Sequence, residues 1–152
     1  MSRHFLSKRD MKLLGERLSH EGIILESGKS IEVEELTGYS IYYVDKKPYL
    51  IDNGSLFPSL YYVNTHRPNH GNVTVDDGAV PHIINGANVF LKGIVQADDG
   101  IKKDQMVFVR DRISRYICVG ISLMDTASLL SRGMGEGIRN IHHLGDIYSN
   151  VS

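Results

Sequence analysis

The stretch from Asp76 to Gly93 constrains the fold of this chain more than any other part of the sequence. Apolar residues recur there at helical spacing, and Pro81 is tolerated only in a first helical turn, so we place a helix at about Val80 to Asn85. Gly86 stands where a left-handed C-terminal cap is expected. Val89 to Leu91 then return to an extended, apolar pattern. The stretch therefore predicts a helix, a glycine turn and a strand in close succession.

This order of elements resembles the opening of a PUA domain, the RNA-binding module named after pseudouridine synthases and archaeosine transglycosylases. Gly86 to Asn88 has the sequence of one branch, the malignant-T-cell-amplified-sequence proteins, the ligatin-like translation factors and their archaeal relatives. Cys118 to Ser122 looks like that branch's Cys-Val-Gly strand, and Gly135 to Leu144 looks like its final strand. Phe57 to Leu60 is similar to its Pro-Ser-Leu step ahead of the domain. The resemblance covers roughly Asn72 to Asp146.

The chain of 152 residues is predicted to form two small domains of the α+β class. Residues 1–71 carry one amphipathic helical pattern followed by alternating strand patterns, which we interpret as a small α+β N-terminal, pre-PUA domain. Residues 72–152 carry many short strand patterns and two small helices, as a mixed β pseudo-barrel would. Thr65 to Asn72, with a proline and a glycine, is the expected linker. We expect residues 72–152 to fold alone, provided that a short helix near Pro58 does not pack deeply into the barrel.

Composition limits the classes of function that the chain can have. Its residues are 41% hydrophobic and 23% charged with a net charge of −1, so any nucleic-acid binding must use a local patch. The single cysteine, Cys118, excludes an intramolecular disulfide and is compatible with a reducing cytoplasm. No apolar run approaches the ~20 residues that span a membrane, and no secretion signal is recognisable. We therefore expect a cytoplasmic protein that does not contact membranes.

No group of residues in the sequence supports catalysis. Cys118 lies within an apolar strand pattern, where a buried, inert thiol is the usual state. His142 and His143 are adjacent, so on a strand their rings point to opposite faces and are poorly placed to chelate one metal ion. His66 and His70 have helical spacing, but a proline between them argues against a helix. We expect no enzymatic activity, no metal site and no cofactor.

The resemblance implies a candidate RNA-binding surface. A glycine turn lets an RNA backbone approach closely because no side chain intervenes, and the segment from Gly86 to Gly93 is expected to offer exposed backbone amides beside one cation. In PUA domains the groove between this turn and the last strand holds RNA. Carried over to the matching positions, the RNA-binding residues are Gly86, Ala87, Asn88, Val89, Lys92, Gly93, Arg139 and His142.

By the same resemblance, the chain is expected to be a non-catalytic RNA-binding protein. Its RNA would be transfer RNA or ribosomal RNA, with the small ribosomal subunit or a translation factor as partner in translation initiation or ribosome recycling. Two alternatives stay open. The chain could present RNA to a separate modification enzyme as an accessory module, or it could be a protein-interaction adaptor that does not bind RNA. A turn that is buried, or flanked by acidic residues, would favour the adaptor.

Overall fold

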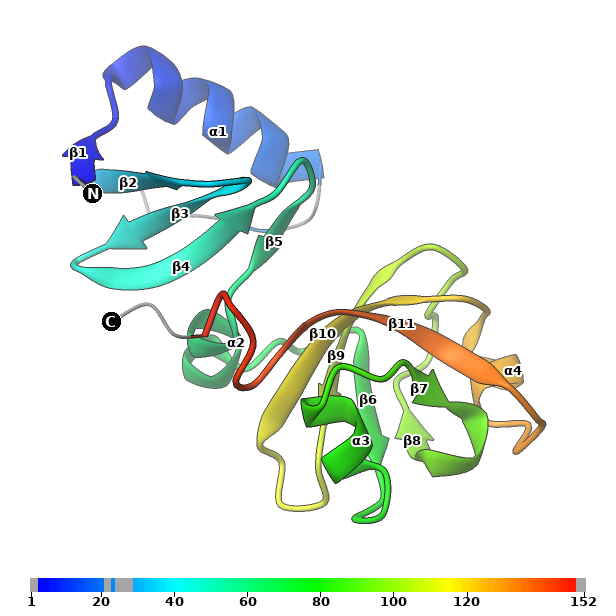
Figure 1. Cartoon of the computed structure of the whole chain (residues 1–152). Coiled ribbons are helices and arrows are strands. Elements are labelled where there is room, and N and C mark those ends of the chain that lie inside the picture. The colour runs from blue at the N-terminus through cyan, green and yellow to red at the C-terminus, as the bar shows by residue number, and fades with distance from the viewer. Residues whose placement is uncertain (1–2, 21–22, 24–28, 150–152) are drawn as a thin grey trace.

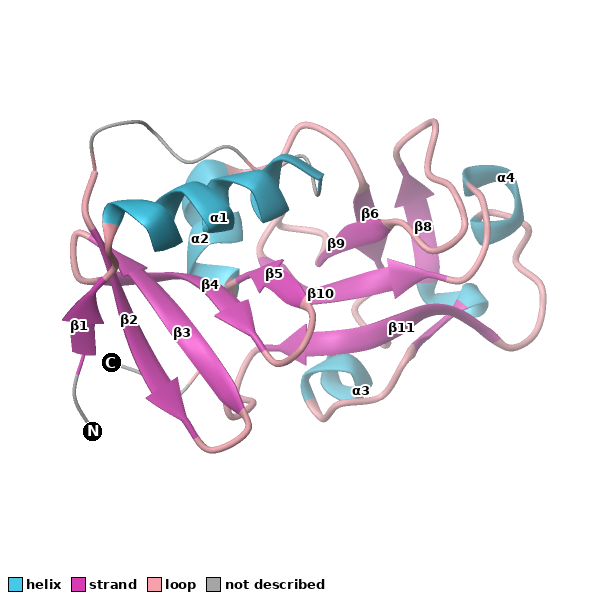
Figure 2. Cartoon of the chain, turned by 90° about the horizontal axis from the view of Figure 1, so that it is seen from above, coloured by secondary structure: helices cyan, strands magenta, loops and turns pink. Residues whose placement is uncertain are grey.

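A computed structural model of the chain describes residues 3–20, 23 and 29–149. Figure 1 shows two curved sheets that follow one another along the chain, with helix α2 (Leu60–His66) between them. Figure 2, turned by a right angle, shows the same two sheets from above and helix α1 (Lys8–His20) over the N-terminal one. The predicted α+β class is confirmed, because helices and sheets both contribute and the C-terminal sheet curls into a half-barrel.

The N-terminal sheet is antiparallel, with the strand order β1-β2-β3-β4-β5. Its strands are β1 (Arg3–Phe5), β2 (Ile31–Leu36), β3 (Tyr39–Val44), β4 (Lys47–Asp52) and β5 (Leu56–Pro58). Strand β2 alternates as its sequence predicts, with Ile31 and Val33 buried. The amphipathic helical pattern of this region corresponds to helix α1, which ends at His20.

The two faces of the N-terminal sheet have different partners. On one face Leu14 and Leu18 of α1 are buried among apolar side chains of β2, β3, β4 and β5. The opposite face turns toward the C-terminal sheet and carries Ile41, Tyr43, Ile51 and Phe57. These residues join one apolar cluster with side chains from α2 and from strands of the second sheet. The sheets are therefore held together by a shared core, in addition to the linker.

The C-terminal sheet has the strand order β7-β11-β10-β9-β6-β8, with β6 and β9 parallel and the other pairs antiparallel. Its elements are β6 (Asn72–Val75), α3 (Val80–Ile84), β7 (Val89–Phe90), the 3-10 turn η1 (Leu91–Gly93), β8 (Ile94–Ala97), β9 (Met106–Arg110), β10 (Tyr116–Ser122), α4 (Thr126–Leu129) and β11 (Glu136–His143). The curled sheet encloses its own core, to which α3 contributes Ile83 and α4 contributes Leu129. The helix predicted at Val80 to Asn85 is thus present, one residue shorter.

Helix α2 connects the two sheets. Leu60 and Val63 are buried in the shared core together with Tyr116 of β10. The side chain of Asn64 donates to the carbonyl of Tyr116 at 3.0 Å and accepts from its N–H at 2.9 Å, like a strand partner at that edge. The short helix therefore packs deeply against the half-barrel, which is the condition under which residues 72–152 are not expected to fold alone.

Candidate nucleic-acid interface

The turn, residues 86–93, begins with the end of helix α3. Gly86 has φ +97°, the left-handed conformation that the sequence predicts for a helix cap. Its N–H donates to the carbonyl of Ile83 at 2.9 Å, and the N–H of Ala87 donates to that of His82 at 3.0 Å, which is the Schellman pattern. These two amides are occupied by the helix itself. The expectation that they are free to donate to phosphate is therefore wrong.

A pair of asparagines fastens the turn to strand β11. Asn140 donates from its side-chain amide to the carbonyls of Ile83 at 3.0 Å and Ala87 at 2.9 Å. Its backbone N–H donates to the side-chain oxygen of Asn88 at 2.9 Å, and the amide of Asn88 donates to Glu136 at 2.8 Å. Both N–H donors of the Asn140 side chain are thus used, one on the last turn of α3 and one on the carbonyl of Ala87. The turn is fixed in shape before any ligand arrives.

A shallow pocket of about 410 Å³ lies between α3 and the turn. Its lining includes the apolar side chains of Ala79, Ile83 and Ala87, with Phe90 and Lys92 beside them. Phe90 is 52% exposed, which is unusual for a strand residue next to a core, and Lys92 is exposed as well. A mostly apolar hollow with an exposed aromatic ring and one cation suits a flat ring that bears a negative group, such as a nucleotide.

Two of the predicted turn residues are buried. Val89 is fully buried in the core and pairs with Ile138 of β11. Gly93 is buried too, and a side chain there would meet the Cβ of Ala79 at 2.9 Å. Gly93 is therefore required for close packing of η1 against the loop before α3, and it has no positive φ. Val89 thus supports the turn from the core, and Gly93 lines the pocket with its backbone alone.

A bulge at Ile141 decides which residues of β11 share a face. The strand pairs with β10 up to Asn140, skips Ile141 and pairs again from His142. Asn140 and His143 consequently face the turn, and His143 lies where a side chain at position 86 would touch it at 3.4 Å. Arg139 and His142 share the opposite face, toward the N-terminal sheet. The two residues of β11 that the sequence assigns to the RNA groove are thus both turned away from the turn.

His142 is 1% exposed and serves as a link between β11 and α2. Its Nε2 accepts from the N–H of Leu60 at 3.0 Å, and its Nδ1 lies 2.8 Å from a carboxylate oxygen of Asp146. A backbone N–H only donates, so Nε2 is the bare nitrogen and Nδ1–H donates to Asp146. Burial raises the pKa of Asp146, but the hydrogen bonds from His142 and from the N–H of His143 outweigh it, and the net pKa is lowered. This placement does not support the expectation that His142 contacts RNA.

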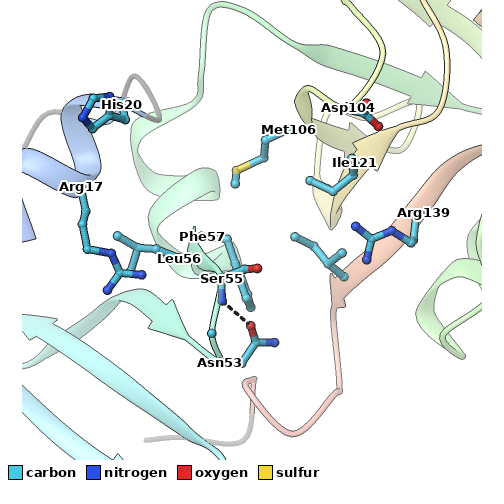
Figure 3. A pocket seen from close by; sticks show the side chains of 12 residues that line it. Arg17, His20, Asn53, Ser55, Leu56, Phe57, Asp104, Met106, Ile121 and Arg139 are labelled. Carbon is cyan, nitrogen blue, oxygen red and sulfur yellow. Dashed lines mark hydrogen bonds between the residues drawn. The ribbon is translucent and has the colours of Figure 1, made fainter.

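Arg139 lines a different cavity, a cleft of about 510 Å³ between the N-terminal sheet and the half-barrel. Figure 3 shows Arg139 and Arg17 on opposite walls of this cleft, with Met106 and Ile121 between them. Arg17 forms an ion pair with Asp52 at 2.8 Å. Lys92 and Arg139 therefore line different pockets. A phosphate bound beside Lys92 would lie outside the cleft that Arg139 lines.

The sequence assigns no binding role to three residues around the turn: Phe90, Asn140 and His143. Phe90 stands in an apolar strand pattern, which cannot tell an exposed ring from a buried one. Asn140 belongs to the segment that resembles the family's last strand, and that was the available signal for it. The position of His143 depends on the bulge, and alternation along the sequence does not reveal a bulge.

The described residues contain little that could support catalysis. Cys118 is fully buried, and burial raises the pKa of its thiol well above the ordinary value, so the reactive thiolate is disfavoured. His66 stacks on Tyr62 with ring centres 4.1 Å apart, while His70 contacts Gln105 instead. Within residues 3–20, 23 and 29–149, no three His, Cys, Asp or Glu side chains are grouped so that they could hold a metal ion. No helix in the same described part is long and apolar enough to cross a membrane.

Two family models match the chain, one after the other. The PUA domain matches residues 71–144, and a domain of unknown function, DUF1947, matches residues 2–66. A conserved PUA domain protein from Thermoplasma acidophilum has a similar structure over nearly its whole length. Its TM-score is 0.84 with 40% sequence identity, covering 96% of each chain.

Curated relatives extend the comparison to eukaryotes. Translation machinery-associated protein 20 of Saccharomyces cerevisiae is 31% identical over 104 residues, which are 64% of this chain and 58% of that protein. Malignant T-cell-amplified sequence 1 of Danio rerio is 23% identical over 127 residues, 81% of this chain and 67% of that protein. These matches confirm the family and the branch expected from the sequence, and they support an RNA-binding role related to translation. The chain belongs to the PUA-domain proteins of the malignant-T-cell-amplified-sequence branch, with a DUF1947 region ahead of the PUA domain.

Proposed function

We propose that this protein binds RNA without catalysis and that the pocket at the turn receives one nucleotide. Phe90 offers a face on which a base stacks, and stacking on an aromatic side chain contributes about 1–3 kcal/mol per base. Lys92 is placed at the same pocket, where its charge attracts the phosphate of the bound nucleotide. The observation that carries this proposal is an exposed ring beside an apolar hollow whose shape Asn140 already fixes.

The residues inferred from the resemblance divide into three roles in this proposal. Gly86, Ala87, Asn88 and Lys92 reach the surface and form the contact region with Phe90. The buried Val89 and Gly93 keep the turn in position. Arg139 contacts RNA only if the RNA also enters the interdomain cleft, and His142 has no part in binding.

The RNA that we propose is transfer RNA or ribosomal RNA of the small subunit, bound in the cytoplasm during translation initiation or ribosome recycling. Membership of the PUA family supports the RNA class, and the name of the yeast relative associates that protein with the translation machinery. The linker and the two family matches also support our proposal of an N-terminal domain at residues 1–71 and a PUA domain at residues 72–152.

Fluorescence anisotropy with labelled total transfer RNA tests the proposal. We expect Phe90→Ala to weaken binding by about one order of magnitude, in keeping with the loss of one stacked base. Phe5→Ala is the matched control, because Phe5 is 66% exposed on β1, away from the turn. If Phe90→Ala binds as well as the parent while both variants melt normally, the base does not lie in this pocket.

One observation favours the adaptor as a second candidate. The turn has acidic neighbours, since Glu136 is bonded to Asn88 and Asp76 lines the pocket. An apolar pocket with acidic neighbours also suits a peptide with an aromatic residue and a basic one. A parent protein that shows no affinity for transfer RNA or for small-subunit ribosomal RNA at low salt would establish this candidate in place of the RNA-binding one.

A further inference from the structure

The connection between β9 and β10, residues 111–115, forms a rigid protruding tip. The buried carboxylate of Asp111 accepts from the N–H of Ile113 at 3.1 Å and from the N–H of Arg115 at 2.9 Å. Ser114 has φ +66°, a left-handed conformation that non-glycine residues rarely adopt. Ile113 is pushed outward and is 85% exposed. The internal hydrogen bonds therefore hold the loop in one shape, with Ile113 at its end.

One arginine braces this tip from outside the loop, and another stands at the end of β9 where the loop begins. Arg67, which follows α2, donates from Nη2 to the carbonyl of Ser114 at 2.7 Å, and its guanidinium lies 5.0 Å from the ring centre of Tyr116. Arg110 donates from Nε to the hydroxyl of Thr74 at 3.0 Å. Each of these contacts uses one edge of a planar group that carries five N–H donors. Arg67 is exposed and Arg110 is half-buried.

The other two arginines belong to the tip itself. Arg115 lies 3.3 Å from the carboxylate of Asp111 through its Nε, and about half of its side chain is exposed. Arg112 is exposed at the end of the loop. Four arginines thus lie in or against this one loop, and the carboxylate of Asp111, which is buried, pairs with Arg115. This concentration of positive charge stands in a chain whose net charge is −1.

The turn lacks such a concentration of charge. Lys92 is the cation at its pocket, and Asp76 lines the same pocket. The turn therefore has a pocket that suits a base but little positive charge to attract a phosphate backbone. The tip instead has the positive charge that attracts phosphates. Guanidinium groups bind phosphate with two parallel N–H bonds, and phosphate contacts supply most of the affinity of proteins for nucleic acids.

We propose that the arginine tip, residues 110–115 with Arg67, is a second RNA contact that binds the phosphodiester backbone of the same RNA whose base enters the pocket at the turn. Figure 1 shows the yellow β9–β10 connection and the loop before α3 at the same lower end of the C-terminal sheet. The bond from Arg110 reaches Thr74, two residues before Asp76 of the turn pocket. Ile113 packs against the sugar face between contacted phosphates.

The proposal rests on the proposed function, and one set of variants separates the two. Full-length protein is titrated with labelled total transfer RNA over a series of salt concentrations. We expect Arg112→Glu to weaken binding about tenfold at low salt and to reduce the slope of log affinity against log salt by about one. Ile113→Ser is expected to weaken binding without changing that slope. Arg132→Glu is the matched control, since Arg132 is an exposed loop arginine with φ +55°, and it should bind nearly as the parent does.

Circular dichroism melting of every variant, and Arg112→Gln as a milder change, exclude a folding defect. If Phe90→Ala weakens binding while Arg112→Glu and Arg112→Gln match the parent in affinity and slope, the tip is no RNA contact although the proposed function stands. If the parent protein binds no RNA, both the proposal for the tip and the proposed function are wrong. If the parent binds polyglutamate as tightly as transfer RNA through Arg112, the tip is a site for acidic proteins and the RNA assignment is overturned.

Discussion

The two faces of strand β11 contact different parts of the molecule. On one face Asn140 and His143 meet the turn, and their contacts fix a surface that is open to a ligand. On the other face Arg139 lines the cleft toward the N-terminal sheet, and His142 is bonded to the first residue of α2. One strand thus shapes the proposed RNA pocket and holds the two sheets together.

The difference between these faces shows how one bulged residue can place neighbouring side chains at different sites. Without the bulge at Ile141, strict alternation would put Asn140 and His142 on the same face. With it, both residues that contact the turn are on one face, and both residues directed at the N-terminal sheet are on the other. The pocket and the interdomain contact are consequently adjacent in sequence and separated in space. Changes on one face should affect ligand binding and changes on the other should affect domain cohesion.

Removing residues 1–71 should have the largest effect on the stability of the C-terminal half-barrel. A fragment of residues 72–152 lacks Leu60 and Val63, so Tyr116 and its neighbours in the shared core lose their cover. We expect this fragment to unfold over a broad temperature range and to bind the dye ANS, as loosely packed states do. A fragment of residues 59–152 retains α2 and should melt at a higher temperature. Equal, cooperative melting of the two fragments would show that α2 is not part of the half-barrel's stability.

Asn140→Leu should have the next largest effect, on the turn face. The leucine leaves the carbonyl of Ala87 without its side-chain donor, which costs about 1–3 kcal/mol in the free energy of unfolding, whereas the carbonyl of Ile83 still accepts from the N–H of Gly86. Transfer-RNA binding should fall with it, because the turn loses its fixed shape. Arg139→Leu is the control on the other face, with an expected change within about 0.5 kcal/mol. Urea unfolding measures both, and an equal loss in the two variants would refute the division of faces.

The sequence predicted the turn well because its determinants are local. A helix with a proline in its first turn and a glycine at the left-handed cap can be recognised from adjacent residues, and Val80–Ile84 and Gly86 agree with it. The occupation of the Gly86 and Ala87 amides was not foreseen, although the cap that was predicted requires it. Whether the backbone N–H groups of a cap can bind a ligand is known only once each hydrogen bond within the cap has been assigned.

The residues of β11 were predicted less well because their placement is not local. Arg139 and His142 were assigned to the groove by resemblance, and the bulge at Ile141 turns them toward the N-terminal sheet. The burial of His142 depends on α2, whose residues lie far away in sequence. The arginine tip likewise gathers Arg67 from the linker with residues of a hairpin. Such constellations depend on the register of strands and on packing, which periodicity in the sequence does not encode.

Gly86→Ala should have a smaller effect than Asn140→Leu. At φ +97° a side chain is strained by about 1–2 kcal/mol, and the new methyl group would lie 3.4 Å from Nε2 of His143. Gly15→Ala is the matched control, because Gly15 lies in α1 with open space around it, and alanine there should stabilise the helix by about 0.5–1 kcal/mol. Thermal melting should therefore move in opposite directions for the two substitutions, and a stabilised Gly86→Ala would contradict the left-handed cap.

The smallest expected effect concerns Asp146, which follows β11 and is bonded to His142 on the face that holds the sheets together. One carboxylate oxygen accepts from His142 Nδ1 and from the N–H of His143, and the other accepts from the N–H groups of Tyr148 and Ser149. The net lowering of the Asp146 pKa means that the folded protein favours the ionised carboxylate more than the unfolded chain does. The resulting stability is present above the ordinary aspartate pKa of about 3.9 and is lost as pH falls through that value toward the lower folded pKa.

Asp146→Asn should therefore flatten the acid side of the stability profile. The variant is less stable than the parent at pH 7, because the amide nitrogen cannot accept the hydrogen bonds that an oxygen accepted. The difference between the two proteins should shrink between about pH 5 and pH 3, since only the parent has this carboxylate to protonate. Asp99→Asn, at an exposed turn, is the control and should leave the profile parallel to the parent's. Urea unfolding at half-unit pH steps gives the comparison, and a constant difference between parent and Asp146→Asn from pH 7 to pH 3 would show that this carboxylate does not couple the two sheets to pH.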